Sequence, residues 1–312
     1  MAEEKTKLPR HHGRYSEDMV VFKGMLAYMP QVRSMKVRDD DLIIATWIKC
    51  GTTWAQSIIL HILNDADVSK VSSGGKTIDK LFPMIEQINL SLLFAEPETI
   101  EVEDIEEMPS PRFLKTHIPL RYLCDDIKNR LKRPKIIYVS RNPKDALTSL
   151  YHFDMKGFYV PGVTDDDYSA APLSHLLQEF YNDDCVFGSY WKHNLEFWNR
   201  RNDENVLFIF YEDMIKDHAG QVKKIADFLD KKLTDEQIQQ IVEKTSFLKM
   251  RSDTFSNYSH IKAIQSPTAT PFQRKGVVGD WKNHFTVAQS EEFDKVYQEK
   301  FAGTGLQHIF EI

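Results

Sequence analysis

The sequence predicts an α/β protein in which helices cover both faces of a central parallel β-sheet, a P-loop-like three-layer α/β/α arrangement. Four short apolar runs have the length of buried strands, and they alternate with longer segments of helical periodicity. Of the 312 residues, 42% are apolar and 28% are charged, which is ordinary for a globular domain. We expect a flexible N-terminal arm at residues 1–15 and a single domain at residues 16–312.

The expected elements follow one another along the chain. The strands are Asp41–Trp47, Arg112–Thr116, Lys135–Ser140 and Val206–Tyr211. The helices are Thr52–Leu63, one that begins after Pro143, one that runs from the fourth strand through Phe228, and one at Val287–Phe301. Residues 252–278 are rich in Ser, Thr and Pro, which favours a long ordered loop or a lid.

Charge and cysteine content limit the classes of partner and compartment. With 40 basic and 46 acidic residues the net charge is −6, which argues against nucleic acid or an anionic membrane as the main partner. The basic run at 128–135 and the acidic runs at 101–107 and 165–167 are interpreted as solvated surface. Three scattered cysteines, no apolar stretch of roughly 18 residues and a polar N-terminus predict a cytoplasmic protein.

The strongest local signal follows the first expected strand, at Lys49-Cys50-Gly51-Thr52-Thr53-Trp54. A glycine turn that opens a helix directs free backbone N–H groups and the positive end of the helix dipole at one place. The lysine and the two threonines add further donors. This segment predicts a phosphate or sulfate cradle, although the lysine precedes the glycine and the order differs from the common nucleotide-triphosphate loop.

Two more strands are expected to end in polar residues at the same edge of the sheet. Lys115 and His117 follow the second strand, where an imidazole can act as a general base and a lysine can stabilise negative charge. Arg141 follows the third strand and offers a planar fork for a phosphate. Ser149 lies two helical turns further on. A surface pair between Arg141 and Asp145 is the alternative for the arginine.

Taken in order, these motifs resemble those of the cytosolic sulfotransferases. The resemblance runs from about Phe22 to the C-terminus and rests on residues 49–54, 115–117, 141 with 149, 211–213, 245–247 and 274–281. It implies 3′-phosphoadenosine 5′-phosphosulfate (PAPS) as the sulfuryl donor, adenosine 3′,5′-bisphosphate (PAP) as the product, and no required metal.

The resemblance also implies a role for each matching residue. The 5′-phosphosulfate is assigned to Lys49 through Thr53, with Trp54 stacked on adenine. The 3′-phosphate is assigned to the side chains or backbone of Arg141, Ser149, Arg274, Lys275 and Gly276. The surroundings of the adenine are assigned to Tyr211, Thr245, Ser246, Phe247 and Met250.

For catalysis, we expect His117 to take the acceptor proton, Lys49 to stabilise the leaving oxygen and Lys115 to help at the transferring group. The family suggests that Ser149 holds Lys49 back until the acceptor arrives. The acceptor is expected to be a small lipophilic phenol, steroid, alcohol or amine. Its binding residues, by resemblance, are Met25, Phe82, Met84, Lys115, His117, Phe153 and Tyr258.

Two positions of the cradle depart from the family pattern, and a C-terminal segment adds a further resemblance. Ile48 and Cys50 stand where the family has Pro and Ser, which is expected to alter donor affinity rather than abolish activity. Cys50 is interpreted as a substituted serine, and a thiol with a lowered pKa that is sensitive to oxidation at the helix N-terminus is the alternative. Residues 282–291 resemble the family's short dimerisation segment, which predicts a homodimer.

Two other functions stay open at this stage. A P-loop small-molecule or nucleotide kinase is the first, because Glu212 and Asp213 end an apolar strand as magnesium ligands would. A non-catalytic binding protein that keeps the donor pocket is the second.

Overall fold

The computed structural model describes residues 12–67, 77–86, 102–154, 173–261 and 271–312. Its centre is a four-stranded parallel sheet with the strand order β4-β3-β5-β6. The strands are β3 (Leu42–Ala45), β4 (Phe113–Thr116), β5 (Lys135–Ser140) and β6 (Val206–Phe210). The predicted α/β fold with a central parallel sheet is confirmed.

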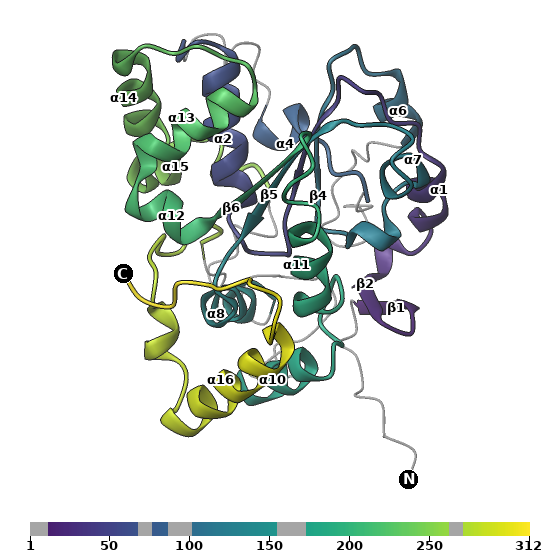
Figure 1. Cartoon of the computed structure of the whole chain (residues 1–312), viewed down its shortest axis with the longest axis vertical. Coiled ribbons are helices and arrows are strands. Elements are labelled where there is room, and N and C mark those ends of the chain that lie inside the picture. Colours follow the sequence, from purple (N-terminus) through teal and green to yellow (C-terminus); the bar gives the residue numbers. More distant parts are fainter. Residues whose placement is uncertain (1–11, 68–76, 87–101, 155–172, 262–270) are drawn as a thin grey trace.

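Helices flank this sheet (Figure 1). On one side lie α2 (Thr52–Leu63), α12 (Tyr211–Lys216), α13 (His218–Phe228), α14 (Asp235–Lys244) and α15 (Phe247–Ser252). On the other side lie α1 (Met29–Ser34), α6 (Val102–Glu107) and α7 (Asp125–Lys128). The remaining helices are α4 (Ile78–Leu81), α8 (Pro143–Asp154), α10 (Leu173–Tyr181), α11 (Tyr190–Trp198) and α16 (Val287–Phe301). Short 3-10 turns occur at Lys23–Met25, Leu120–Tyr122 and Asp280–Asn283.

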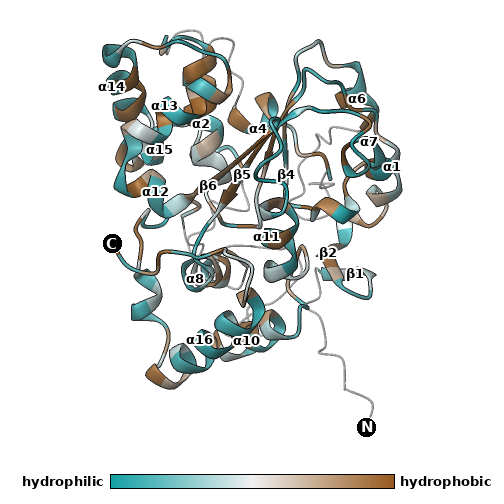
Figure 2. Ribbon diagram, viewed as in Figure 1, coloured by the Kyte–Doolittle hydropathy of each residue, from teal (hydrophilic) through white to brown (hydrophobic). Residues whose placement is uncertain are grey.

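The strands are buried because helices cover both faces of the sheet. All of Leu42–Ala45 is at most 4% exposed, and Figure 2 shows the central strands as hydrophobic while outer helices such as α14 and α16 carry hydrophilic surface. On β5, the Tyr138 ring stacks on Phe197 of α11 with the ring centroids 4.4 Å apart. This packing fixes the sheet rigidly beneath the loops that follow its strands.

Most of the expected elements are found, with small differences at their ends. The strands at 135–140 and the helices at 52–63 and 287–301 have the predicted bounds. The helix expected to run from β6 through Phe228 is divided into α12 and α13, because Asp217 leaves the helical conformation and caps α13 by accepting from the Gly220 N–H. The acidic run at 101–107 contributes α6, whereas residues 165–167 lie outside the described residues.

The N-terminal boundary also differs from the expectation. His12–Ser16 form strand β1, which pairs antiparallel with β2 (Met19–Phe22). Residues 12–15 of the expected arm therefore belong to the folded protein, because their backbone completes a two-stranded ladder that the short, polar sequence did not reveal. Residues 1–11 lie outside the described residues.

The register of the parallel strands brings the four expected motifs to one edge. Ala45 at the end of β3 lies beside Thr116 of β4 and Tyr138 of β5, and Ser140 lies beside Phe210 of β6. The segments that begin at residues 46, 117, 141 and 211 therefore all leave the sheet at its carboxyl edge, where open α/β sheets bind their ligands.

Candidate active site

The cradle turn between β3 and α2 depends on two residues with left-handed backbone. Lys49 has φ 64° and Gly51 has φ 99°. A Cβ atom at Gly51 would lie 2.7 Å from the Tyr211 ring, so only glycine lets that ring approach. Gly51 is the N-cap of α2 and supplies no side-chain cap, which leaves the first backbone N–H groups of this helix available to an anion.

A threonine that the sequence analysis did not single out connects the cradle to the expected base. The Thr46 hydroxyl lies 2.7 Å from the Thr52 hydroxyl at the start of α2, and 3.1 Å from Nδ1 of His117. The same Nδ1 atom lies 3.1 Å from the Thr46 carbonyl oxygen. Position 46 was visible only as the penultimate residue of an apolar run, so no motif indicated this role.

The environment of His117 favours the neutral imidazole. Burial, assisted by the positive charges of Lys115 and Lys49, lowers the pKa of His117 to about 3. A neutral ring that donates from Nδ1 to the Thr46 carbonyl keeps Nε2 as an acceptor. The ring is therefore in the tautomer that can remove a proton from a neighbouring hydroxyl.

Lys115 stays charged beside this histidine. Burial acts to lower the pKa of Lys115, but the Tyr258 hydroxyl and the carboxyl groups of Asp79 and Glu86 raise it above the usual range. The ammonium donates to the Tyr258 hydroxyl at 3.1 Å. Lys115 and His117 therefore present a fixed positive charge and a neutral base from the end of one strand.

The expected second anion site begins at Arg141 and is nearly closed to solvent. The guanidinium donates to the carbonyl oxygens of Lys49 at 3.1 Å and Val277 at 3.3 Å, and it lies 4.4 Å from the centroid of the Tyr211 ring. Its Nε atom is buried and has no hydrogen-bond partner among the described residues. An unpaired buried donor in this position suits an anionic ligand. The alternative hydrogen-bonded pair with Asp145 is not formed, because that carboxylate accepts from Gly279 and Trp281.

The segment at Arg274–Gly276 reaches the same region from the C-terminal part of the chain. The Asp280 carboxylate binds both cations, accepting from Arg274 at 2.5 Å with Oδ2 and from Lys275 at 2.5 Å with Oδ1. Gly276 has φ 66°, and a Cβ atom there would lie 2.2 Å from the Phe247 ring. The positive charge of Arg274 is near enough to help lower the pKa of Lys49, so the two basic groups face a common space.

Aromatic residues lie between the cradle and this segment. The Trp54 and Tyr211 rings meet edge to face with centroids 5.4 Å apart, and the Trp54 Nε1–H donates to the Thr245 carbonyl at 2.8 Å. Thr53 and Met250 are also buried. Ser246 differs from the rest, since its hydroxyl donates to the Glu243 carbonyl at 2.8 Å and serves the local turn.

A family model described as the sulfotransferase domain matches residues 39–305. The chain belongs to the sulfotransferase family. The protein named sulfotransferase 1B1 from Canis lupus familiaris is 37% identical over 276 residues, which cover 88% of each chain. Human sulfotransferase 1C2 is 36% identical over 283 residues, which cover 90% of each chain.

Solved structures give the same result for the fold. Mouse sulfotransferase SULT7A1 complexed with PAP superposes with a TM-score of 0.73 at 29% identity, covering 94% of each chain. Retinol dehydratase in complex with androsterone and PAP superposes with a TM-score of 0.79 at 23% identity, covering 93% of this chain and 89% of that chain. These likenesses agree with a sulfotransferase built on an α/β sheet.

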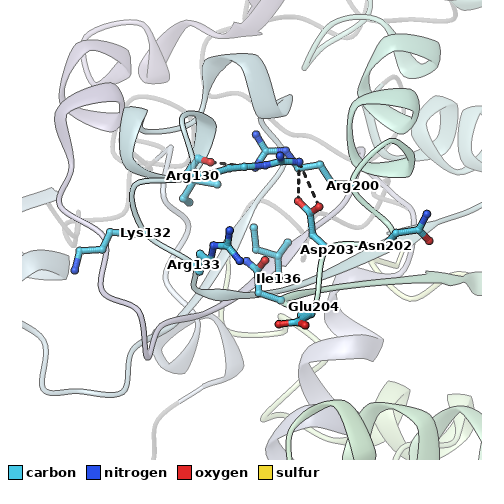
Figure 3. Close-up of a pocket in the computed structure, with 10 residues that line it drawn as sticks. Arg130, Lys132, Arg133, Ile136, Arg200, Asn202, Asp203 and Glu204 are labelled. Carbon is cyan, nitrogen blue, oxygen red and sulfur yellow. Dashed lines mark hydrogen bonds and ion pairs between the residues drawn. The ribbon is translucent and has the colours of Figure 1, made fainter.

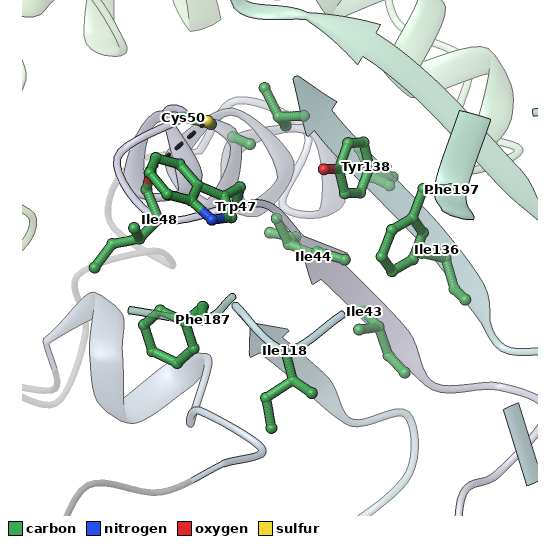
Figure 4. Close-up of a cluster of buried hydrophobic side chains, with 14 of the residues drawn as sticks. Ile43, Ile44, Trp47, Ile48, Cys50, Ile118, Ile136, Tyr138, Phe187 and Phe197 are labelled. Carbon is green, nitrogen blue, oxygen red and sulfur yellow. Dashed lines mark hydrogen bonds between the residues drawn. The ribbon is translucent and has the colours of Figure 1, made fainter. Parts of the chain in front are cut away.

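The alternative of a reactive thiol at Cys50 of this sulfotransferase is wrong. The thiol is 0% exposed and lies in the apolar cluster with Ile48 and Trp47, where its Sγ atom points to the Ile48 carbonyl (Figure 4). Burial raises the pKa of Cys50 far above the usual range of a thiol. The left-handed turn at Lys49 directs the side chain of residue 50 into the core, so proximity to a helix N-terminus does not activate it.

The expected acceptor residues fall into two groups. Met84 forms a backbone bridge with Lys115, Phe153 lies beside Lys49, and Tyr258 lies beside Lys115. Met25 and Phe82 are 0% exposed in the core. Phe272, which no motif indicated, completes the aromatic side of the site by contacting Phe153 and Tyr258.

The kinase alternative is not favoured. Glu212 is 0% exposed, and its Oε1 atom accepts from the backbone and side-chain amides of Asn142 at 2.8 and 3.2 Å. Its charge is further disfavoured because burial raises the pKa of Glu212 to about 7. In the part of the chain that the structure describes, no group of three or more acidic, His or Cys residues is arranged to hold a metal.

The basic run at 128–135 lies at the other end of the strands. Arg130, Lys132 and Arg133 line a cavity of about 230 Å³ with Arg200 and Asp203 (Figure 3). Arg130 binds Asp203 at 3.0 Å, and Arg200 donates to backbone carbonyls. Because the cavity borders the start of β5 and β6, it is remote from the carboxyl edge and is not part of the candidate active site.

Proposed function

We propose that this sulfotransferase takes a sulfuryl group from PAPS and transfers it to a hydroxyl or amine of a small lipophilic acceptor. The observation that supports this most directly is the chain of contacts from Thr52 through Thr46 to His117, each of about 3 Å or less. It supports the proposal that His117 acts as a base beside an anion cradle. Transfer between a cradled anionic donor and a nucleophile requires that proximity.

The chain offers what a donor with two anionic groups needs. The start of α2 provides backbone N–H groups for the 5′-phosphosulfate, and Arg141 provides a buried unpaired Nε–H toward the 3′-phosphate side. Gly51 and Gly276 let the Tyr211 and Phe247 rings pack closely against the backbone, and Trp54 meets Tyr211 edge to face. When bound, PAPS supplies an activated sulfuryl group. We propose the further donor contacts Cys50 (backbone only), Thr53, Ser149, Tyr211, Thr245, Met250, Arg274 and Lys275, whereas the Ser246 side chain serves the turn.

The residues around the cradle divide the catalytic work. His117 accepts the proton of the acceptor hydroxyl at Nε2 and holds it while Nδ1 stays bound to Thr46. Lys49 stabilises the negative charge that develops on the departing bridging oxygen, and Lys115 stabilises the charge at the transferring group. Ser149 is half-exposed on α8, and among the described residues no hydrogen bond joins its hydroxyl to Lys49.

The acceptor side is aromatic and apolar. Met84, Phe153 and Tyr258 surround the two lysines, and this chemistry suits a phenol, a steroid or another lipophilic alcohol. The charge of Lys115 beside a neutral base favours an acceptor that is neutral before it loses its proton. A panel of phenols, sterols, alcohols and amines with sulfur-labelled PAPS tests the proposal, with ATP and Mg²⁺ as the donor control.

Replacement of the base gives the decisive variant. His117→Ala should lower turnover by roughly 10²–10⁴-fold, because the proton acceptor is lost, while PAP still binds. Retained turnover in this variant with intact donor binding would exclude His117 as the base. Transfer of labelled phosphate from ATP, with no transfer of sulfate from PAPS, would exclude the sulfotransferase proposal altogether.

We also propose that two copies associate through residues 282–291. Thr286 caps α16 in a capping box with Gln289, which fixes the start of that helix and leaves Val287 with 75% exposure. Val287→Glu should then shift the mass measured by light scattering from dimer to monomer.

A cytoplasmic location agrees with three buried free cysteines, and among the described residues no helix is long and apolar enough to cross a bilayer.

A further inference from the structure

The ammonium of Lys49 lies between two aromatic rings. Its Nζ atom is 4.0 Å from the centroid of the Phe153 ring and 4.1 Å from that of the Phe272 ring. The two rings meet edge to face, with their centroids 5.8 Å apart. Phe153 belongs to α8, and Phe272 belongs to the segment that begins at residue 271. Two cation–π contacts at these distances make a cage for a single ammonium.

We propose that Phe153 and Phe272 are positioning residues that hold the Lys49 ammonium toward the acceptor side, and that a planar acceptor releases it to the donor. This inference rests on the proposed function and concerns when Lys49 acts. An ammonium enclosed by two ring faces must give up at least one of them before it can bind the bridging oxygen closely. The cage therefore restrains Lys49 while the acceptor side is empty of substrate.

The neighbouring charges show why a cage is needed at this position. Burial, together with the positive charges of Arg141 and Arg274, lowers the pKa of Lys49 to about 7. Among the described residues no carboxylate forms an ion pair with Lys49, so the negative ring faces are its nearest compensating groups. The rings stabilise the charged form without neutralising it, which an ion pair would do.

The cage continues into the surface where the acceptor is proposed to bind. Phe272 packs on Tyr258 with centroids 4.4 Å apart, and the Lys115 ammonium donates to the Tyr258 hydroxyl. A flat ring that enters this surface competes with the Lys49 ammonium for the faces of Phe153 and Phe272. Binding of the acceptor is thereby coupled to release of Lys49, which an aliphatic alcohol without a ring face would achieve less well.

The coupling has a chemical consequence for the donor. In productive transfer the acceptor oxygen bonds to sulfur, the bond from sulfur to the bridging oxygen breaks, and the acceptor proton goes to His117. In wasteful hydrolysis a water oxygen bonds to sulfur instead, and the products are PAP, sulfate and a proton. Both reactions need charge stabilisation on the same leaving oxygen, so a restrained Lys49 suppresses hydrolysis.

The test measures release of labelled sulfate from PAPS by the full-length protein with no acceptor present. Phe272→Leu should raise this rate roughly threefold to tenfold, the range that loss of one desolvated cation–π contact allows. Phe153→Leu should act in the same direction and replaces it if the first variant folds poorly. Phe272→Tyr keeps the ring and should restore the slow rate. Phenolic acceptors should be turned over faster than aliphatic alcohols only in proteins that keep both rings of the cage.

A matched control separates the cage from a general loss of packing. Phe255→Leu removes a buried ring from the same C-terminal part of the chain, and its ring has no cation over it among the described contacts. The proposal is overturned if Phe272→Leu hydrolyses PAPS at the wild-type rate, or if Phe255→Leu raises hydrolysis equally. Failure of the proposed function would look different, because the wild-type protein would then transfer label to no acceptor.

Discussion

The Glu86 carboxylate holds the backbone of the proposed base: its Oε1 atom accepts the His117 N–H at 2.5 Å. Its Oε2 atom accepts from the Thr116 hydroxyl at 2.8 Å, and that hydroxyl in turn accepts from the Ile118 N–H at 3.1 Å. Glu86 is 0% exposed. One buried side chain therefore fixes three consecutive residues at the end of β4, and with them the direction of the imidazole.

Removal of this support should affect turnover more than donor binding. Glu86→Ala is expected to lower kcat by roughly tenfold or more, because the buried His117 N–H and Thr116 hydroxyl lose their hydrogen-bond acceptor. Glu86→Gln keeps one acceptor and should lose less. Steady-state kinetics with PAP titrations measure the split, and an equal loss of PAP affinity would show that Glu86 supports the whole site.

Glu86 also gives the stability of the protein a defined pH dependence. Burial raises the pKa of Glu86 to about 7, against the hydrogen bonds that lower it, so the folded protein holds a proton that the unfolded chain releases near pH 4.5. Glu86 therefore contributes stability that is lost as pH rises from about 4.5 to 7, whereas the buried His117, His193 and His308, whose pKa values burial lowers to about 3, contribute stability that is gained over much of the same range. Relative to the wild type, Glu86→Gln should make the free energy of unfolding rise more steeply with pH in denaturant titrations between pH 4.5 and 7. An unchanged slope would contradict the assignment.

Donor binding should depend on pH through Lys49. Because the pKa of Lys49 is lowered to about 7, the ammonium is partly deprotonated at neutral pH, and an anion in the cradle restores the charged form. PAP affinity is expected to fall as pH rises above 7, with uptake of up to one proton. Calorimetry in buffers of different ionisation enthalpy measures that uptake. A pH-independent affinity with no proton uptake would rule out this role.

Asp280 should set the preference for a 3′-phosphate. Its carboxylate is 3% exposed and holds Arg274 and Lys275 together, which prevents the two cations from separating. Asp280→Asn is expected to lower PAP affinity roughly tenfold, while affinity for adenosine 5′-monophosphate, which lacks the 3′-phosphate, stays the same. An increase in PAP affinity would instead identify Asp280 as a competitor of the phosphate.

Gly276 should tolerate no side chain. In Gly276→Ala the new methyl group would collide with the Phe247 ring at 2.2 Å, in addition to the cost of alanine at φ 66°. Gly303→Ala is the matched control, since φ is 70° there and nothing lies within 4 Å of the added Cβ. Thermal unfolding should show a larger loss for Gly276→Ala than for Gly303→Ala, and only Gly276→Ala should also weaken PAP binding. Equal PAP binding by the two variants would mean that the Phe247 ring moves aside to accommodate the added methyl group.

The sequence by itself determined the sheet, its helices and the residues that meet at the carboxyl edge. Apolar runs of strand length predict parallel strands, and parallel strands necessarily deliver Lys49, His117 and Arg141 to one side. The order of the motifs also indicated the family that the comparisons then showed. These properties are local or topological, so a one-dimensional pattern can carry them.

The tertiary structure alone decided which side chains touch. Thr46, Glu86 and Phe272 gained their proposed roles from contacts across the fold, and none belongs to a motif that the sequence analysis used. Cys50 shows the same limit in reverse, because its place at a helix start left a reactive thiol open as an alternative, and only the buried position of the side chain excludes it. The burial and direction of a side chain depend on the three-dimensional structure, and they determine its protonation state and its reactivity.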